Sequence, residues 1–459
     1  MPGPAPTHSA SRGRRRAASP WVAVALVISL ACGCAPAGPP PADAATYGVH
    51  IDMNTPQGLH AKQTLDMVNS DWPIGPVGVR TLAVPAQVDN VVAALDRLWW
   101  DRPITVTSID VGAGEATLHT LTSYGAAQDI ALRTKDGGLV DRFKVTIQPP
   151  PIHKWADIDA ELTKSGARYS YQVSKVTDGK CTTLAGSNLD QSLPLASIFK
   201  LYVLLAVADA VNTGTLSWTD QLTISAEDKA VGSAGFDHLP PGSRVSVHDA
   251  AQQMISASDN MATDLLIARL GPGAIDRALV AAGHHDPASM TPFPTAHELF
   301  AIGWGDPDIR EQWQKAVEHG GSQGRARILE LTNKNPYDPD PYRTHTPASG
   351  FGAEWYGSAA DICRVHAALQ TAAVGPAAPV RDILSATPGI DLNQSNWRYI
   401  GAKGGNLPGD LTFSWYAEDR TGQAWVVSFQ LNWQKYRSLA AAEWLLSIAK
   451  QAFGLIPVG

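Results

Sequence analysis

Long apolar runs, basic residues and cysteines are all scarce in this chain of 459 residues, which has only four cysteines. The apolar run near the N-terminus, Trp21 to Ala31, has eleven residues, whereas a membrane-spanning helix needs about 20. Acidic residues outnumber basic residues by 43 to 36, which argues against a nucleic-acid partner. There is no phosphate-binding glycine loop, and His297-Glu298 lacks the second histidine of a zincin motif. His284-His285-Asp286 could contact a metal, but such a stretch is more typical of a polar loop. We therefore expect neither a cofactor nor a metal.

The first 34 residues are typical of an export signal. Arginines precede the apolar run, and Cys32-Gly33-Cys34 and a Pro/Ala-rich stretch follow it. Small residues followed by a cysteine resemble a bacterial lipobox, which predicts lipidation at Cys34 or at Cys32. Residues 35–47 would then be a tether, and we expect an exported lipoprotein on the outer side of the cell membrane. An ordinary cleaved signal is the alternative.

Two cysteines, Cys181 and Cys363, remain once the leader is removed. Outside the cytosol such cysteines can form a disulfide. The sequence alone leaves open whether these two meet.

The rest of the chain divides at Pro149-Pro150-Pro151, because three prolines hold an extended backbone. Residues 48–148 show two helical patterns and then a meander of four strands, which predicts a small α+β domain. Residues 152–459 begin with a helix and two strands, are mainly helical in the middle, and end with three strands and a helix. Strands at both ends with helices between them predict one sheet with an inserted helical lobe. The fold class is therefore mixed α/β, of the α+β type, with a cleft where sheet and lobe meet.

Ser197 and Lys200 stand three residues apart at the start of an apolar helical run that continues to Leu205. This spacing puts both side chains on one helix face, about a turn apart. A serine hydroxyl needs a neighbouring base to become a nucleophile, and a lysine can be that base only when burial or nearby cations lower its pKa. A second Ser-x-x-Lys, at Ser447 and Lys450, falls in a C-terminal amphipathic helix and is expected on its solvated face.

Two further motifs follow Ser197 in order. Ser258-Asp259-Asn260 opens a helix 61 residues after Ser197, and Lys403-Gly404-Gly405 ends the first strand that follows the helical middle. The ordered set S-x-x-K, S-D-N and K-T-G is the signature of class A β-lactamases and penicillin-binding proteins. From residue 154 onward the chain resembles this family. More narrowly, it resembles actinobacterial lipoproteins of the LpqF type and the β-lactamase-like protein of clavulanic-acid gene clusters.

The resemblance implies a fold and a set of roles. The fold is an antiparallel sheet flanked by terminal helices with an inserted all-helical lobe, preceded by a domain like the cystatin or steroid-isomerase fold. Ser197 would attack a carbonyl carbon with Lys200 as base. The implied catalytic residues are Ser197, Lys200, Ser258 and Lys403, and the implied substrate-binding and oxyanion residues are Asn260, Gly405 and Asn406. Asp259 is expected to cap a helix or to anchor a loop.

Two departures from the family pattern bear on activity. The Glu-x-x-Leu-Asn pattern, whose glutamate activates the water that clears the acyl-enzyme, is missing between Leu270 and Thr291, and Glu298 falls inside the next helix. Gly404 replaces the hydroxyl residue that would bind a β-lactam carboxylate. We therefore expect a serine hydrolase, weak as a β-lactamase, that cleaves an amide, β-lactam or ester bond in a small-molecule or peptidoglycan-like substrate. The alternatives are a slow penicillin-binding or sensor lipoprotein and an envelope interaction protein.

Overall fold

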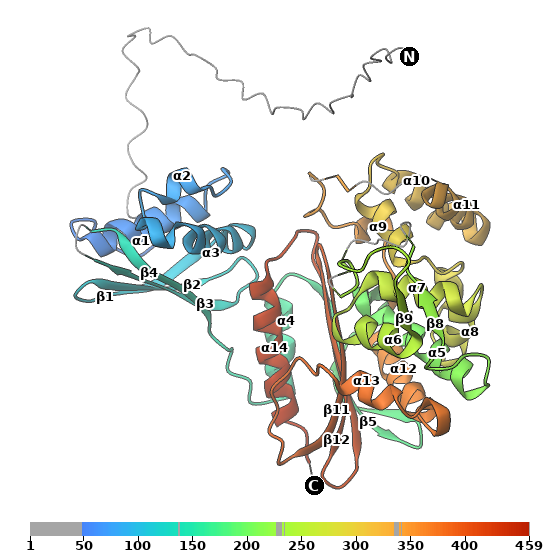
Figure 1. The fold of residues 1–459 in the computed structure, drawn as a ribbon. Helices are drawn as coiled ribbons and strands as arrows, with labels where there is room; N and C mark the ends of the chain where they lie inside the picture. The colour runs from blue at the N-terminus through green and yellow to red at the C-terminus, as the bar shows by residue number, and fades with distance from the viewer. Residues whose placement is uncertain are drawn as a thin grey trace, which may run out of the picture. The chain divides into compact units, whose positions relative to one another are not determined.

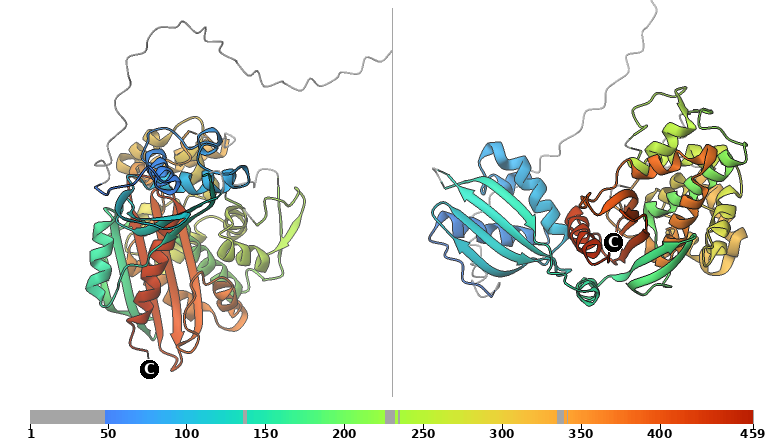
Figure 2. Two further views of the ribbon diagram at one scale, coloured as in Figure 1. Left: turned by 90° about the vertical axis from the view of Figure 1, so that its left-hand side faces the viewer. Right: turned by 90° about the horizontal axis from the view of Figure 1, so that it is seen from below.

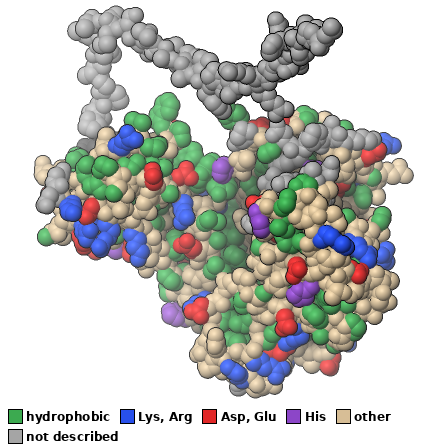
Figure 3. Space-filling model, in the orientation of Figure 1, with side chains coloured by type: hydrophobic (Ala, Val, Ile, Leu, Met, Phe, Trp, Pro, Cys, Tyr) green, Lys and Arg blue, Asp and Glu red, His purple; other side chains and the backbone are tan. Residues whose placement is uncertain are grey.

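The computed structural model describes residues 48–135, 138–225, 232–233, 235–334, 339–340 and 342–458. The leader, the tether and both lipidation candidates, Cys32 and Cys34, lie outside these residues. Among the described residues, none of the helices has the length and apolarity needed to cross a membrane. Acidic and basic side chains are interspersed on the face shown in Figure 3.

Residues 48–147 form a four-stranded antiparallel sheet with helices packed against one face (Figure 1). The elements are α1 (Pro56–Val68), α2 (Pro76–Val79), α3 (Val88–Trp100), β1 (Thr105–Val111), β2 (Glu115–Leu121), β3 (Ala127–Thr134) and β4 (Val140–Ile147). The core holds Leu65 and Leu95 from the helices and Leu118 and Ile130 from the strands. The expected order of helices followed by a meander is observed, and the short helix α2 is an addition.

Residues 152–458 form a five-stranded antiparallel sheet, with the first and last helices of this region on one face (Figures 1 and 2). The elements are α4 (Trp155–Lys164), β5 (Arg168–Thr177), β6 (Lys180–Ser187), β11 (Trp397–Leu407), β12 (Asp410–Asp419), β13 (Ala424–Asn432) and α14 (Leu439–Gly454). The strand order is β11-β12-β13-β5-β6, so strands from the two ends of the region pair in the interior of the sheet. Because β11 is an edge strand, one of its sides stays open.

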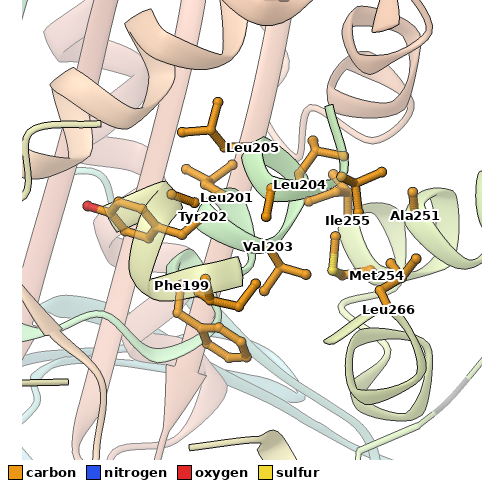
Figure 4. Packing of buried hydrophobic residues seen from close by; sticks show 14 of the residues in the cluster. Phe199, Leu201, Tyr202, Val203, Leu204, Leu205, Ala251, Met254, Ile255 and Leu266 are labelled. Carbon is orange, nitrogen blue, oxygen red and sulfur yellow. The ribbon is translucent and has the colours of Figure 1, made fainter. Parts of the chain in front are cut away.

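The helical lobe covers the other face of this sheet. Its helices are α5 (Lys200–Asn212), α6 (Val247–Ser256), α7 (Asn260–Leu270), α8 (Ala274–Ala281), α9 (Ala296–Trp304), α10 (Arg310–Lys315), α11 (Gly321–Lys334), α12 (Ala359–Ala372) and α13 (Val380–Ser385). From Lys200 to Ala208 the side chains of α5 are buried all round, and Val203 and Leu204 pack against Met254 of α6 and Leu266 of α7 (Figure 4). The expected fold class is confirmed: a sheet flanked by terminal helices, with an inserted helical lobe.

A disulfide joins Cys181 of β6 to Cys363 of α12, which answers the question left open by the sequence. It ties the edge of the sheet to the lobe across 182 residues of sequence. Because the cross-link restricts the unfolded chain, Cys363→Ala should lower the free energy of unfolding by about 3–5 kcal/mol. Thermal unfolding with and without reductant measures this difference. The alanine variant should be insensitive to reductant, and an equally insensitive wild-type chain would contradict the expectation.

Candidate active site

Ser197 lies on a single 3-10 turn, Ala196–Phe199, that leads directly into α5. Ala196 has a φ of 43°, in the left-handed region that residues other than glycine seldom adopt. The turn is held from two sides. The hydroxyl of Thr412 on β12 donates to the Leu195 carbonyl at 2.8 Å, and the Leu195 amide donates to the Trp355 carbonyl at 2.8 Å. Such strained turns persist only where the surrounding structure fixes them, and they cluster at functional sites.

Lys200, the first residue of α5, is 0% exposed. Its Nζ lies 2.6 Å from the Ser258 carbonyl oxygen, 2.6 Å from Oδ1 of Asn260, and 3.2 Å from the hydroxyl oxygens of both Ser197 and Ser258. Burial, with a contribution from the charge of Lys403, lowers the pKa of Lys200 well below its usual range. A neutral amine has two N–H groups and one lone pair. The two short bonds to carbonyl-type oxygens can use both N–H groups, which leaves the lone pair for a hydroxyl proton.

Ser258 lies between the two lysines. Its Oγ is 3.2 Å from Nζ of Lys200 and 2.9 Å from Nζ of Lys403, and its own φ is 58°. Lys403 on β11 is 4% exposed and donates to the Gly404 carbonyl at 2.6 Å. Burial lowers the pKa of Lys403 to about 7. Ser197, Lys200, Ser258 and Lys403 therefore form one continuous hydrogen-bonded row along which a proton can pass.

Asp259 and Asn260, between Ser258 and the body of α7, have different surroundings. Asp259 is the N-cap of α7: its carboxylate accepts from the amides of Ala262, Gly235 and Phe236, each at 2.8 Å. It also anchors the loop before α6, as expected from the sequence. Asn260 instead turns its amide oxygen to Lys200.

The edge strand β11 passes directly beside Ser197. A Cβ on Gly405 would lie 2.4 Å from the Ser197 amide nitrogen, so position 405 has no room for a side chain. Gly404 faces a different neighbour, because a Cβ there would lie 3.0 Å from the Phe413 ring on β12. A threonine at 404 would therefore require the Phe413 ring to shift by a few tenths of an ångström. Asn406 continues the edge strand past Ser197.

Two other candidate groups from the sequence lie elsewhere. Ser447 donates to the Trp444 carbonyl within α14, and Lys450 of the same helix is 56% exposed, as expected for a solvated face. Glu298 is part of the capping box of α9. Its carboxylate accepts from the Thr295 amide at 2.7 Å and from the Asn333 side chain at 2.6 Å. These contacts give the carboxylate a structural role at the start of α9.

Three buried carboxyl groups were not found by sequence reasoning. Burial raises the pKa of Asp264 to about 7, and this carboxylate accepts from two amides at the start of α9. Burial, together with the charge of Asp410, raises the pKa of Glu354 well above its usual range. The Glu354 carboxyl is 4% exposed and accepts from the Trp355 amide at 2.7 Å. A lone acidic residue in an apolar stretch was the signal available for Glu354 and for Asp264, whereas Asp410 had none.

One group of described residues has the composition of a metal site. His284, His285 and Asp361 bring ligand atoms within 4.8 Å of one another. The Asp361 carboxylate, however, caps α12, accepts from the Ser358 hydroxyl and pairs with Arg364. These contacts give the cluster a structural role at the start of α12.

Comparison with known protein families finds a likeness in the region that holds Ser197. Residues 154–302 match the family model described as "Beta-lactamase enzyme family". This part of the chain is similar to that family, and residues 152–458 are called the β-lactamase-like part below. Residues 52–140, before the β-lactamase-like part, match the model described as "ORF 12 gene product N-terminal". A comparison with curated proteins found no match.

Solved structures with some likeness to the chain include β-lactamases. That of Sphaerobacter thermophilus is 21% identical, with a TM-score of 0.45, and the match covers 67% of this chain and 100% of that chain. The chromosome-encoded β-lactamase of Vibrio parahaemolyticus is 15% identical, with a TM-score of 0.46 and coverages of 65% and 97%. PBP-A is 17% identical, with a TM-score of 0.45 and coverages of 68% and 100%. These likenesses are too weak to indicate an activity. Support for catalysis therefore comes only from the residues of this chain.

Proposed function

We propose that the β-lactamase-like part is a serine hydrolase that cleaves an amide, β-lactam or ester bond through an acyl-enzyme on Ser197. The position of the Lys200 amine carries this proposal. It is buried, its pKa is lowered, and it reaches the hydroxyls of both Ser197 and Ser258. As a neutral amine it takes the Ser197 proton during attack, and Ser258 then delivers a proton to the leaving group. Lys403 orients Ser258 and supplies positive charge for a substrate carboxylate.

The negative charge that develops on the attacked carbonyl oxygen needs hydrogen-bond donors. We propose the amides of Ser197 and Asn406 for this role, since β11 passes against Ser197 at Gly405. Backbone donors of this kind contribute about 3–4 kcal/mol of transition-state stabilisation in serine hydrolases. The absence of a side chain at Gly405 lets the edge strand approach closely enough.

We propose slow clearance of a β-lactam acyl-enzyme. The Glu-x-x-Leu-Asn pattern is missing, and Glu298 is occupied by the cap of α9. The same observation favours the second candidate, a penicillin-binding or sensor lipoprotein that acylates and then turns over slowly. An envelope interaction protein that uses residues 48–148 as its own domain is the third candidate.

We propose the cell envelope as the place of action. The export signal, the lipidation candidates Cys34 and Cys32, and the tether at 35–47 support an exported lipoprotein. A small-molecule or peptidoglycan-like substrate fits this location. The motif order and the N-terminal α+β domain support, as part of this proposal, a relation to the LpqF-type lipoproteins and the β-lactamase-like protein of clavulanic-acid gene clusters.

Intact-protein mass spectrometry over time, with a β-lactam and separately with a small acetyl ester, tests the proposal. We expect a mass gain of one acyl group with each compound, which decays more slowly for the β-lactam. Glu298→Gln is the matched control and should decay like the wild-type chain. A β-lactam adduct that never decays would favour the sensor. The absence of any adduct and any product would remove the catalytic proposal.

A further inference from the structure

A cavity of about 170 Å³ lies where the residues before α9, the helices α10 and α11, and the segment before α12 meet. None of the four described residues in the hydrogen-bonded row from Ser197 to Lys403 lines it, so it is separate from the candidate active site. The volume is enough for about six water-sized groups. The apolar side chains in its walls are Met290, Pro292, Pro294, Trp313 and Val317.

Arg325 of α11 lines this cavity and is only 7% exposed. Its Nε donates to the Thr291 carbonyl at 3.0 Å, and its Nη2 donates to the Ala288 carbonyl at 2.6 Å, whereas its Nη1 donates to none of the described residues. The exposed Asp286 also lines the cavity, but its carboxylate accepts from the Ser289 amide and forms no ion pair with Arg325. A buried cation without a counter-ion is costly, and an anionic group on a bound molecule would offset that cost.

Glu354 lines the same cavity and is 4% exposed. One carboxyl oxygen accepts from the Trp355 amide at 2.7 Å, but Oε2 is buried and has no hydrogen-bond partner among the described residues. Burial and the charge of Asp410 raise the pKa of this carboxyl group, although the nearby Ala196 amide favours the charged form. Glu354 and Arg325 form no ion pair with each other. A cationic donor on a bound molecule would therefore supply the partner that Glu354 lacks.

The two groups together indicate the chemical class of the ligand. The cavity presents a buried cation and a buried carboxyl group that are not paired, with several apolar side chains around them. A molecule with one carboxylate and one ammonium group would satisfy both. The small volume limits the rest of that molecule to a short side chain. A small α-amino acid, such as glycine or alanine, matches this description.

Two short strands connect the cavity with the nucleophile turn. They are β7 (Leu193–Pro194) and β10 (Tyr356–Gly357), which pair with each other. Ser192, which lines the cavity, directly precedes β7. The Leu195 amide, directly after β7, donates at 2.8 Å to the carbonyl of Trp355, the residue before β10. A ligand in this cavity would therefore restrain both strands and, through them, the turn that carries the nucleophile.

We propose that this cavity binds a small amino acid, with its carboxylate on Arg325 and its ammonium group on Glu354, and that the bound molecule stabilises the turn that carries Ser197. Binding uses ionic contacts and hydrogen bonds only and changes no covalent bond. The inference goes beyond the proposed hydrolase function and does not depend on it.

Equilibrium dialysis of the full-length chain against radiolabelled glycine, L-alanine and D-alanine tests the binding site. We expect saturable binding of at least one of these amino acids, with one molecule per chain. Propionate and ethylamine each carry only one of the two charged groups, so both should bind at least tenfold more weakly. The absence of saturable binding for all three amino acids would overturn the proposal. Equal binding of propionate or ethylamine would overturn the assigned class of ligand.

Two variants test the cavity by different means. Glu354→Gln keeps the shape of the side chain and the acceptor for the Trp355 amide but removes the charge, whereas Ser192→Leu fills the cavity and leaves both charged groups in place. Each should weaken binding of the amino acid at least tenfold. Glu298→Gln is the matched control, because Glu298 is also a buried glutamate but does not line the cavity, and its binding should equal that of the wild-type chain. Binding that survives both Glu354→Gln and Ser192→Leu would overturn the location of the site.

Hydrogen exchange tests the connection with the nucleophile turn in the absence of any substrate. The Leu195 amide should exchange at least threefold more slowly when the amino acid is bound, and Glu354→Gln should remove this difference. Unchanged exchange in the wild-type chain would overturn the connection. Because neither binding nor exchange requires catalysis, a failure of the hydrolase proposal would leave these results unaffected.

Discussion

Alanine at position 197 is expected to abolish the covalent adduct and to reduce ester hydrolysis roughly a thousandfold or more, because no other hydroxyl can take the place of the nucleophile. Ser258 is close to Lys200, but its Oγ also contacts Lys403 and its backbone conformation is different. Burst kinetics and intact mass measure the two effects in the same samples. The fold should be unaffected, since Ser197→Ala removes one oxygen, which accepts a hydrogen bond from Lys200 at 3.2 Å.

Ser447→Ala is the matched control for this experiment. Ser447 also stands three residues before a lysine, but it lies in α14 and bonds to its own helix. We expect adduct formation and hydrolysis to match those of the wild-type chain. Adduct formation that survives Ser197→Ala would show that a different residue is acylated.

Lys200→Met should lower the rate of acylation by about 100-fold or more, because it keeps the apolar length of the side chain and removes the base. Lys200→Arg should lower the rate of acylation as well. An arginine side chain remains charged in proteins and has no lone pair to accept the Ser197 proton. Comparison of the two variants separates the role of a base from that of a positive charge. Lys450→Met, in the second Ser-x-x-Lys, should have no effect.

The pH dependence of acylation follows from the direction of the Lys200 pKa. Lys200 is protonated below its pKa and neutral above it, so the acylation rate of the wild-type chain should fall as the pH is lowered through that pKa. Because burial lowers the pKa well below its usual value of about 10.4, the rise in rate should come at a lower pH than an ordinary lysine would give. A pH–rate profile from 5 to 10 measures the rising limb. A rate that rises only above pH 10 would show that Lys200 has an ordinary pKa and is not the base.

The motifs made the centre of this site predictable because each has a fixed local geometry. Ser197 and Lys200 share a helix turn, and Ser258 and Asn260 flank the N-cap of one helix. Their order along the chain then indicated which of two Ser-x-x-Lys pairs belongs to the site. The helices in the middle of residues 152–459 and the three strands that follow them were predictable for a similar reason. The spacing of apolar residues within one segment indicates whether that segment is a helix or a strand.

The remaining features depend on contacts between distant elements, which periodicity does not report. The crowding at Gly404 comes from Phe413, which faces it only because of the register between β11 and β12. Asp410 is a turn residue by sequence, and its burial follows from how Asn432 packs over it. The contact between Asp101 and Ser438 joins residues more than 300 positions apart. The pattern of residues in a single sequence gives no information about which distant residues form such pairs.

The pairing of β5 with β13 has a consequence for how the chain is made. β5 is synthesised early and its partner, Ala424–Asn432, almost last, and Thr412, which holds the Ser197 turn, belongs to the strand between β11 and β13. During synthesis the lobe is therefore complete while β5 is paired with β6 alone and still lacks β13. The nucleophile reaches its final position only when the last strands close the sheet, so a growing chain remains without an assembled active site until translation is nearly finished.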